Sequence, residues 1–425
     1  MERETITLDA RAQQRLYVLN HLLTGENTAA EAAASLRVTV RTVRRLLAAY
    51  RSDRSAAALV HGNRGRVPAN RLDDAARARL VELASTTYAG ANRAHLADLL
   101  AEREELIIPE RTLRRVLAEA GLPAARTRRP RGHRTRRERM TQAGLLLQVD
   151  GSRHDWLEGR GPQLTLVGGI DDASGHVTGG TFRDAEDAAG YFEMLRQTAT
   201  LQGLPLGIYS DRHGIFWHGR HVATLAEQFT GQRARTQFGR ALEAAGIAWI
   251  AARSPQAKGR IERLWGTLQD RLVVELRLAG AATREEANAV LATYLPRHNA
   301  RFAVPPANPE PAWRPVPTDR SPESLFCFTH PRRVARDGTV TLAGRTLMLL
   351  GQPAAPGWRG EVVVEERLDG SLWARVDGIL HPVVAAPERP VILRERAPAR
   401  SSPAHPPMPP ASDHPWRRYP AVRPR

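Results

Sequence analysis

The order of strands and helices that the sequence predicts between residues 144 and 310 constrains the fold more than any other feature. Three apolar runs come first, over 145–151, 164–170 and 176–182, and the turn DDASG joins the second and third as a hairpin. Five further elements alternate between helix and strand, over 185–203, 205–211, 236–246, 247–252 and 255–277. This order predicts an α/β domain whose sheet begins with three antiparallel strands.

This order of strands and helices places three acidic residues at or near the ends of predicted elements. Asp150 and Asp211 lie at the ends of apolar runs with strand character, and Glu262 lies on the long helix, one turn after Lys258. Carboxylate oxygens are the ligands that Mg²⁺ prefers. Two such ions about 4 Å apart can hold the attacking and leaving oxygens of a phosphodiester displacement. We therefore predict that Asp150, Asp211 and Glu262 are catalytic metal ligands for two Mg²⁺ or Mn²⁺ ions.

A structural reading of the same residues stays open. A single Asp at a strand end is usually a turn or cap residue. Helical spacing predicts that Lys258 and Glu262 lie on one face of the long helix, where they would also make an ordinary surface ion pair. The opposite face is predicted to be a buried stripe of Ile261, Leu264, Trp265, Leu268 and Leu272. However, Lys258 is the only lysine in a chain that uses arginine everywhere else, and a compact ammonium suits a small site better than a planar guanidinium does. We assign Asp171 and Asp172 to the hairpin turn, as structural residues.

The net charge of +17 indicates a polyanionic partner, because contacts with phosphates release counterions. A membrane surface is less favoured, since no apolar run approaches the length of a spanning helix and the N-terminus lacks a signal-peptide pattern. Cys327 is the only cysteine, so an intrachain disulfide or a cysteine-based zinc site is excluded. We expect a protein of the reducing cytoplasm, without a membrane or small-molecule partner.

Residues 8–50 predict three helices in a helix-turn-helix pattern. Apolar residues recur at helical spacing over 8–23, an alanine-rich helix covers 28–36, and the third helix covers 39–50 with Thr39 as its N-cap. The third helix is the expected recognition helix. Four of its residues are predicted to be exposed and to contact DNA, namely Arg41, Thr42, Arg44 and Arg45.

The same pattern returns seventy positions later. The run RTVRRLLA at 41–48 aligns without a gap with RTLRRVLA at 111–118, and helices are predicted before it over 75–84 and 93–103. A repeat of this kind predicts two tandem DNA-binding modules, although each run alone could be an Arg-rich helix with a solvated face. The corresponding contact residues are Arg111, Thr112, Arg114 and Arg115.

The remaining segments differ in composition. Residues 126–139 hold eight arginines and one acid, which predicts a flexible segment lying along DNA phosphates. Alternating apolar and polar residues with DG and GS turns predict a small five-stranded barrel, and the Pro-, Ser- and Arg-rich end predicts disorder. We expect helix-turn-helix units over 1–55 and 56–125, a basic linker over 126–142, the α/β core over 143–312, the barrel over 325–392 and the tail over 393–425.

The motifs QVDGS, IDDASG, YSDRHGIF, SPQAKGRIERLWGTLQDRL and RHNARFAVPPANP resemble those of the DDE transposases of the retroviral-integrase superfamily, most closely the ISNCY-type insertion-sequence transposases. The resemblance covers residues 8–390 and implies an RNase H-like core. It also implies that Asp150, Asp211 and Glu262 hold the metal ions. By the same resemblance, Lys258 contacts the transposon end, and we expect Arg260, two positions later, to bind DNA as well. The spacing from Asp211 to Glu262 is wider than in retroviral integrases, and the extra residues at 214–233 are interpreted as a loop insertion, which costs little.

The resemblance further implies a DNA transposase that binds the terminal inverted repeats of its insertion sequence. Cleavage of the DNA ends and strand transfer would follow in one site. Two ends must be joined together, so the expected partners are double-stranded DNA and a second or further copy of the chain. Two alternatives remain at this point: a non-catalytic helix-turn-helix regulator with a decayed core, and an RNase H-like nuclease that acts on hybrids.

Overall fold

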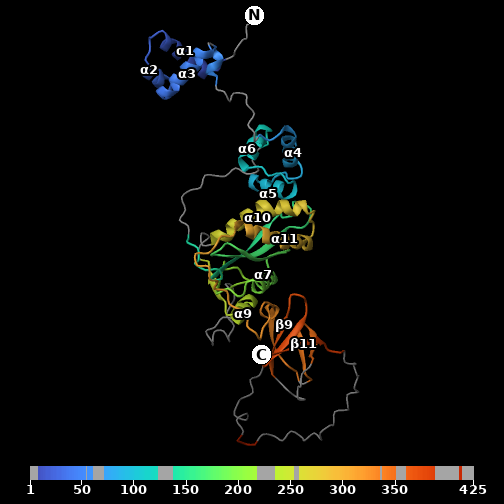
Figure 1. The fold of residues 1–425 in the computed structure, drawn as a ribbon. Helices are drawn as coiled ribbons and strands as arrows, with labels where there is room; N and C mark the ends of the chain where they lie inside the picture. The colour runs from blue at the N-terminus through green and yellow to red at the C-terminus, as the bar shows by residue number, and fades with distance from the viewer. Residues whose placement is uncertain are drawn as a thin grey trace, which may run out of the picture. The chain divides into compact units, whose positions relative to one another are not determined.

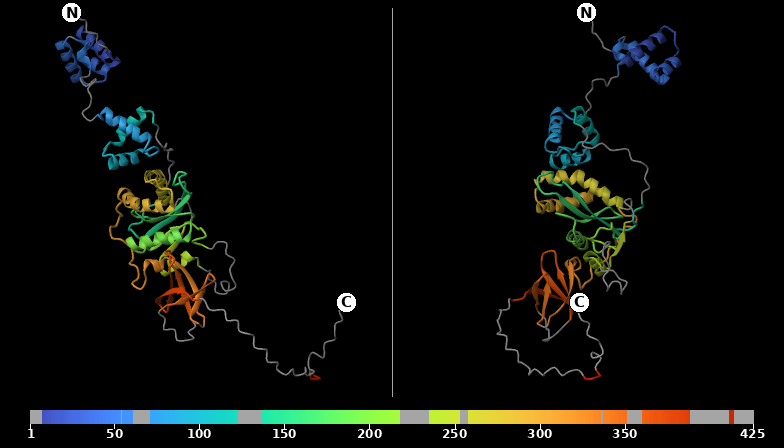
Figure 2. Two further views of the ribbon diagram at one scale, coloured as in Figure 1. Left: turned by 90° about the vertical axis from the view of Figure 1, so that its right-hand side faces the viewer. Right: turned by 180° about the vertical axis from the view of Figure 1, so that it is seen from behind.

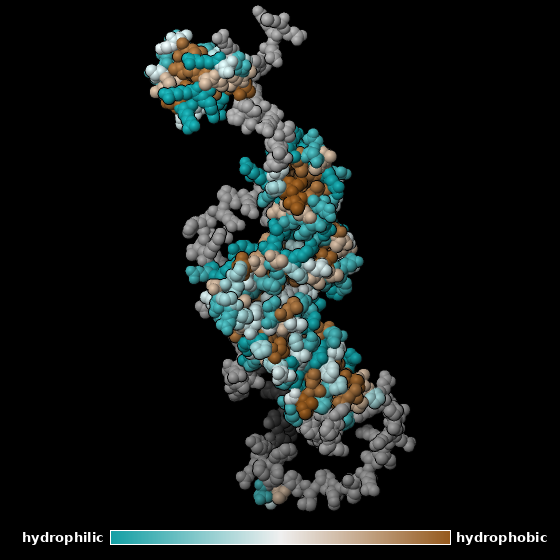
Figure 3. All heavy atoms as spheres, in the orientation of Figure 1, coloured by the Kyte–Doolittle hydropathy of each residue, from teal (hydrophilic) through white to brown (hydrophobic). Residues whose placement is uncertain are grey.

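A computed structural model of the chain describes residues 8–53, 55–60, 71–122, 137–217, 235–252, 258–335, 337–350, 360–387 and 411–413 (Figure 1). The chain divides into two compact units, Met1–Arg126 and Thr127–Arg425. Among these described residues, no helix has both the length and the apolar character needed to cross a membrane. Hydrophobic side chains occur in scattered patches on the visible face in Figure 3.

The first helical module contains α1 (Ala10–Leu23), α2 (Ala29–Leu36), α3 (Val40–Asp53) and the 3-10 helix η1 (Ala56–Leu59). Thr28 begins α2 with a capping box, in which its hydroxyl and the Glu31 carboxylate each accept from the other's backbone N–H. Leu19, Val43 and Leu59 are buried in one hydrophobic cluster. Because Leu59 belongs to this cluster, the module continues past the predicted boundary at residue 55.

The second helical module contains α4 (Asp74–Ser85), α5 (Arg93–Arg103) and α6 (Glu110–Glu119). Leu80, Leu100 and Leu113, one from each helix, are fully buried. The helices predicted from the sequence are therefore present in both modules, with ends that differ by at most three residues.

The central domain is built on a five-stranded sheet with the order β3-β2-β1-β4-β5. Its strands are β1 (Leu146–His154), β2 (Leu164–Asp171), β3 (Val177–Arg183), β4 (Gly207–Ser210) and β5 (Ala248–Ala251). The first three strands pair antiparallel, whereas β4 and β5 run parallel to β1. Since β4 pairs in parallel with the first half of β1, the residue that follows β4 lies beside the middle of β1.

Helices cover both faces of this sheet (Figures 1 and 2). On one face, α7 (Ala188–Leu201) and α9 (Gln237–Ala244) pack against Leu147 and Val149 of β1. On the other face, α10 (Gly259–Leu278) and α11 (Arg284–Phe302) pack against the apolar side chains of β2 and β3. The three-antiparallel-strand start and the two helix layers confirm the predicted RNase H-like core.

The C-terminal domain is a nearly closed, barrel-like sheet with the order β6-β9-β10-β11-β8-β7. It follows the short helix α12 (Pro322–Leu325), and its strands are β6 (Phe328–Arg333), β7 (Thr339–Leu342), β8 (Arg345–Leu349), β9 (Glu361–Glu366), β10 (Leu372–Val376) and β11 (Ile379–Ala385). A hydrogen bond from Arg332 Nε to the Thr341 carbonyl, 3.0 Å long, joins the two edge strands.

The barrel has six strands, so the predicted number of five was wrong. The missed strand is β6, whose sequence FTHPRR has no alternation of apolar and polar residues and contains Pro331. Proline is tolerated because β6 is an edge strand that pairs only with β9. The predicted tail over 393–425, apart from residues 411–413, lies outside the described residues. Most of the loop insertion at 214–233 and the basic linker up to residue 136 also lie outside them.

Candidate active site and DNA-binding helices

Asp150 lies on β1, on the face of the sheet that α10 covers. Side chains alternate along a strand, so Asp150 and Ser152 point to the same side. Trp265 Nε1 donates to Asp150 Oδ2 over 3.2 Å, and Gln269 Nε2, about one turn further along α10, donates to Ser152 Oγ over 3.2 Å. Two side chains on the same face of β1 therefore contact two side chains one turn apart on α10. The contact from Trp265 fixes the orientation of the Asp150 carboxylate.

Asp211 directly follows β4, the parallel neighbour of β1. Its Oδ1 atom accepts a 2.9 Å hydrogen bond from the backbone N–H of His213, which forms a tight turn at the strand end. About half of the Asp211 side chain, 48%, is exposed. The other carboxylate oxygen, Oδ2, faces Lys258.

The ammonium of Lys258 joins the two aspartates. Its Nζ atom lies 2.7 Å from Asp150 Oδ1 and 3.5 Å from Asp211 Oδ2. Burial alone would lower the pKa of Lys258, but the hydrogen bond to Asp150 and the charges of both aspartates outweigh burial and raise that pKa. The ammonium is therefore charged and is shared between two carboxylates that lie 61 positions apart in the sequence.

The position of Lys258 differs from the sequence prediction. We expected Lys258 on the exposed face of the helix beside Glu262, but the residue is only 8% exposed. Lys258 is the N-cap of α10 and so precedes the first residue with helical geometry, which frees its side chain from the helix periodicity. The surface ion pair with Glu262 is excluded as the role of Lys258 in this structure, because its ammonium bonds Asp150.

Glu262 lies in the first turn of α10, with an exposed side chain. The buried stripe predicted for this helix is present, as Ile261, Leu264 and Leu268 are all at most 4% exposed. Within the parts of the chain that the structure describes, no three acidic, histidine or cysteine residues lie close enough together to hold a metal ion. The structure thus brings together Asp150, Asp211 and Lys258, while Glu262 lies apart from them.

The paired aspartates fit a hard divalent cation by two criteria. Their carboxylate oxygens already converge on one cationic atom, the Nζ atom of Lys258. Oxygen is also the ligand type that Mg²⁺ and Mn²⁺ prefer. The described part of the site therefore supplies two candidate ligands, Asp150 from the middle of β1 and Asp211 from directly after β4. Because β1 continues to His154, the expected position of Asp150 at a strand end was wrong.

A second polar cluster lies beside the start of α10 and has Asp172 at its centre. The Asp172 carboxylate is fully buried and accepts from Gln148 Nε2 over 2.7 Å and from the Met140 backbone over 2.9 Å. It also pairs with Arg137 and, over 3.2 Å, with Arg260. Asp172 therefore ties the end of the basic linker to the core, which agrees with the structural role predicted for the IDDASG turn.

Arg260 differs from its prediction as a DNA contact. Its side chain is only 9% exposed, and its guanidinium bonds the Asp172 carboxylate and the Arg137 carbonyl. The residue follows Lys258 by two positions and points into the core because Asp172, buried and anionic, requires a basic partner.

The two predicted recognition helices repeat the same pattern of exposure. In α3, Arg41, Arg44 and Arg45 are exposed, Thr42 is half-buried and Val43 is buried. In α6, Arg111, Arg114 and Arg115 are exposed, Thr112 is half-buried and Leu113 is buried. Both helices therefore present a basic face, as expected if each module binds DNA.

Sequence reasoning missed Trp265 as a residue of the site. It was assigned only to the buried stripe of α10, yet its indole N–H holds Asp150. A buried tryptophan needs a hydrogen-bond partner for its indole N–H, and this requirement could have indicated that Trp265 contacts a polar residue of the site.

Comparison with known proteins identifies relatives along most of the chain. A family model described as a winged helix-turn helix matches residues 15–78. The chain is 35% identical over 377 residues to the putative transposase y4bF of Sinorhizobium fredii (strain NBRC 101917 / NGR234), covering 88% of this chain and 80% of the relative. It is 30% identical over 324 residues to the transposase for insertion sequence IS1202 of Streptococcus pneumoniae, covering 68% of each chain.

Solved structures of retroviral proteins are also found. One is a chain of the simian T-cell lymphotropic virus intasome in complex with PP2A regulatory subunit B56 gamma, with 16% identity, a TM-score of 0.30 and coverage of 72% of this chain and 96% of that chain. Another is the HTLV-2 integrase catalytic core domain in complex with magnesium, with 18% identity, a TM-score of 0.24 and coverage of 36% and 86%.

The two transposases show the family of this chain, because each is at least 30% identical over two thirds or more of both chains. The helix-turn-helix match and the RNase H-like core with paired aspartates on neighbouring strands agree with this family. The chain belongs to the insertion-sequence DNA transposases.

Proposed function

We propose that this transposase binds the terminal inverted repeats of its own insertion sequence, cleaves the DNA ends and joins them to target DNA in a metal-dependent reaction. The observation that supports this most directly is the convergence of Asp150 and Asp211 on one cationic atom, 2.7 and 3.5 Å away. Two Mg²⁺ or Mn²⁺ ions would be held by Asp150, Asp211 and Glu262. When bound, such ions neutralise charge on the phosphate and on the attacking and leaving oxygens.

The residues of the chain have distinct tasks in this proposal. Trp265 keeps the Asp150 carboxylate turned toward α10 through its 3.2 Å hydrogen bond. Lys258 compensates the charge of the two aspartates in the free protein. A DNA phosphate at the site would offer the same ammonium a new anionic partner, so we propose that Lys258 binds the transposon end next to the scissile bond.

Glu262 completes the site from α10. It lies four positions after Lys258, and no contact with another described residue holds its exposed side chain. Its carboxylate would join Asp150 and Asp211 when the metal ions bind.

Recognition of the ends is assigned to the two helical modules. Arg41, Arg44, Arg111 and Arg114 are exposed on helices of matching pattern, and Arg45, Arg115, Thr42 and Thr112 flank them. Phosphate contacts would position the modules and base contacts would select the sequence. Because two ends are joined in one event, we propose that a dimer or larger assembly forms on DNA, in the bacterial cytoplasm at the nucleoid.

The test combines footprinting with end cleavage. DNA that flanks the gene is searched for short inverted repeats, and the full chain is footprinted on them. Cleavage and strand transfer are then measured with Mg²⁺, using Asp150→Asn as the inactive control. Protection of the repeats with Mg²⁺-dependent joining supports the proposal. Protection without cleavage indicates a regulator, and cleavage of RNA–DNA hybrids without protection of the repeats indicates a nuclease of the RNase H type.

A further inference from the structure

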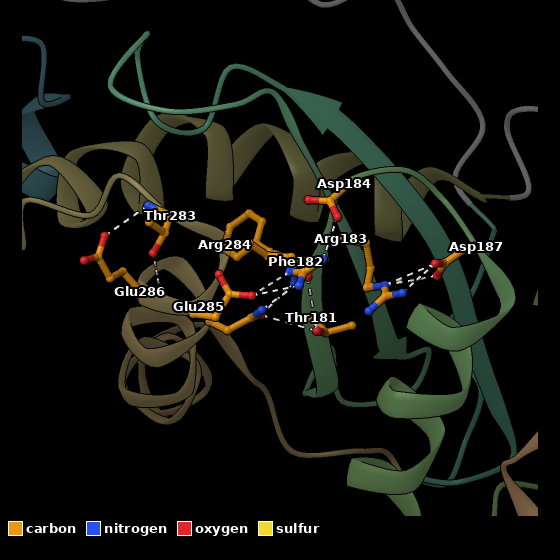
Figure 4. A network of polar contacts seen from close by, with 10 residues as sticks. Thr181, Phe182, Arg183, Asp184, Asp187, Thr283, Arg284, Glu285 and Glu286 are labelled. Atoms are coloured by element: carbon orange, nitrogen blue, oxygen red, sulfur yellow. Dashed lines mark hydrogen bonds and ion pairs between the residues drawn. The ribbon is translucent and has the colours of Figure 1, made fainter. Parts of the chain in front are cut away.

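A short acidic segment, Asp184–Asp187, connects β3 to α7 at the end of the sheet where Asp150 and Asp211 lie. Two of its carboxylates have basic partners (Figure 4). Asp184 Oδ2 accepts from Arg284 Nη1 over 2.6 Å, and Asp187 Oδ2 accepts from Arg183 Nη2 over 2.6 Å. Asp187 also caps α7 through the Gly190 backbone. These contacts fix the backbone on both sides of Glu186.

Glu186 differs from its neighbours, because no basic side chain pairs with it among the described residues. Its Oε1 atom instead accepts a 2.5 Å hydrogen bond from the hydroxyl of Tyr191. The Tyr191 ring is fully buried among the aromatic side chains of the core, where Phe216 and Phe238 pack edge-on against it. The rigid ring therefore holds the Glu186 carboxylate in one position.

That position lies directly against the backbone of β1, next to Asp150. A Cβ atom on Gly151 would lie 2.7 Å from Glu186 Cδ and 2.8 Å from Oε2, closer than such atoms approach one another. Only glycine at position 151 leaves room for this carboxylate. The glycine of the QVDGS motif thus brings Glu186 to the residue that follows Asp150, on the opposite face of the strand.

The charges of the three carboxylates act on the same hydroxyl group. Burial raises the pKa of Tyr191 well above 10.0, and the charges of Glu186, Asp150 and Asp211 raise it further. Glu186 therefore belongs to the same electrostatic environment as the two aspartates. The single charge of the Lys258 ammonium pairs with Asp150 and Asp211, and Glu186 adds a further negative charge from the other face of β1.

We propose that Glu186 is a positioning residue of the cation site, held by Tyr191 and admitted by Gly151, and that it strengthens the binding of divalent metal by Asp150 and Asp211. The inference rests on the proposed function. Because no three acids among the described residues are close enough to hold a metal directly, Glu186 acts through its charge and through water-mediated contacts.

The test is Mn²⁺ and Mg²⁺ binding to the full chain without DNA, measured by calorimetry and by the metal-dependent rise in Tm. Four proteins are compared: wild type, Asp150→Asn, Glu186→Gln and Asp184→Asn. The last variant is the matched control, since it removes a carboxylate from the same segment that is already paired with Arg284. Glu186→Gln should weaken metal binding about 10-fold or more, as loss of outer-shell partners does in metal sites.

Further results separate positioning from a structural role. Glu186→Gln should keep or raise the Tm without metal, because it relieves repulsion among like charges, and should reduce the rise in Tm that metal produces. Tyr191→Phe, which removes only the hydroxyl, should weaken metal binding by about 2- to 10-fold. Asp184→Asn should bind metal as wild type does.

Each failure has its own signature. Wild-type metal affinity in Glu186→Gln, with binding lost in Asp150→Asn, would overturn the inference alone and leave the proposed function standing. A lowered Tm without metal, with unchanged metal affinity, would show a structural role and would overturn it equally. If neither wild type nor Asp150→Asn responds to metal, the proposed function fails and the inference fails with it.

Discussion

The Lys258 ammonium lies 2.7 Å from the Asp150 carboxylate, although 108 residues separate the two in sequence. The contact joins the N-terminal end of α10 to β1, and it extends to Asp211 after β4. The free protein therefore keeps its two aspartates together around an internal positive charge. A divalent cation would compete with the Lys258 ammonium for the two carboxylates. A DNA phosphate would compete with the carboxylates for the ammonium.

Substitution of Lys258 should affect metal binding and DNA strand transfer in opposite directions. In Lys258→Ala the aspartates lose their internal partner, so Mg²⁺ should bind more tightly, whereas strand transfer should fall strongly because the phosphate contact is lost. Lys258→Arg keeps the charge but places a larger, planar group in a nearly buried position, and should restore little activity. Metal calorimetry and strand-transfer assays measure the two effects. Full strand transfer in Lys258→Ala would refute the DNA contact.

Substitution of the proposed metal ligands should abolish catalysis without loss of DNA binding. Asp150→Asn, Asp211→Asn and Glu262→Gln each remove one anionic ligand, and none of these residues belongs to the helical modules that bind the ends. Cleavage and transfer should fall to background while the footprint on element ends persists. Glu262→Gln is the most informative variant, because Glu262 lies apart from the aspartates in this structure. Substantial cleavage by Glu262→Gln in Mg²⁺ would remove that residue from the site.

Much of the catalytic domain could be predicted from the sequence because its signals are local. Asp150 and Asp211 each end an apolar run, and a strand order that makes those runs neighbours brings the two acids together. The buried stripe of α10 followed in the same way from helical periodicity, as the burial of Ile261 and Leu264 shows.

The remaining features depend on contacts that no local pattern encodes. Lys258 was assigned to a helix face, but it precedes the first helical residue, so the periodicity did not apply to it. Arg260 was expected at DNA, and only the fold reveals that Asp172 lies buried beside it. Glu186 and Gly151 had no signal at all, because their close approach arises from the packing of α7 against β1.

The two helical modules should contribute separately to end binding. Arg41→Ala with Arg44→Ala removes two exposed guanidinium groups from α3, and Arg111→Ala with Arg114→Ala removes two from α6. Loss of a base contact costs about 1–3 kcal/mol and relaxes specificity locally, whereas loss of a phosphate contact weakens all sequences alike and lowers the salt dependence.

Footprints and affinities at two or more salt concentrations distinguish these cases for each pair of substitutions. The two double variants serve as controls for one another, because each leaves the other module intact. If one of them binds and protects the repeats as wild type does, the corresponding module is a spacer or a protein-contact surface.

Acidification should destabilise the catalytic domain through His298. This residue of α11 is only 4% exposed, and burial, with the charges of Arg271 and His176, lowers its pKa from 6.5 to about 4. The unfolded chain therefore binds a proton near pH 6.5, while the folded domain resists protonation until about pH 4. Stability from this group is complete above pH 6.5 and falls as the pH drops through that window, by at most about 3 kcal/mol.

The variant His298→Gln isolates this effect, because glutamine does not titrate and can still bond the Tyr294 hydroxyl that lies 3.5 Å from His298 Nδ1. Unfolding of the full chain is followed by tryptophan fluorescence between pH 7.5 and 4.5, where Trp156 and Trp265 report on the core. Wild type should lose more stability than His298→Gln across this range, although the variant starts lower at pH 7.5. Equal pH dependence in the two proteins would show that His298 is not the group that makes the core sensitive to acid.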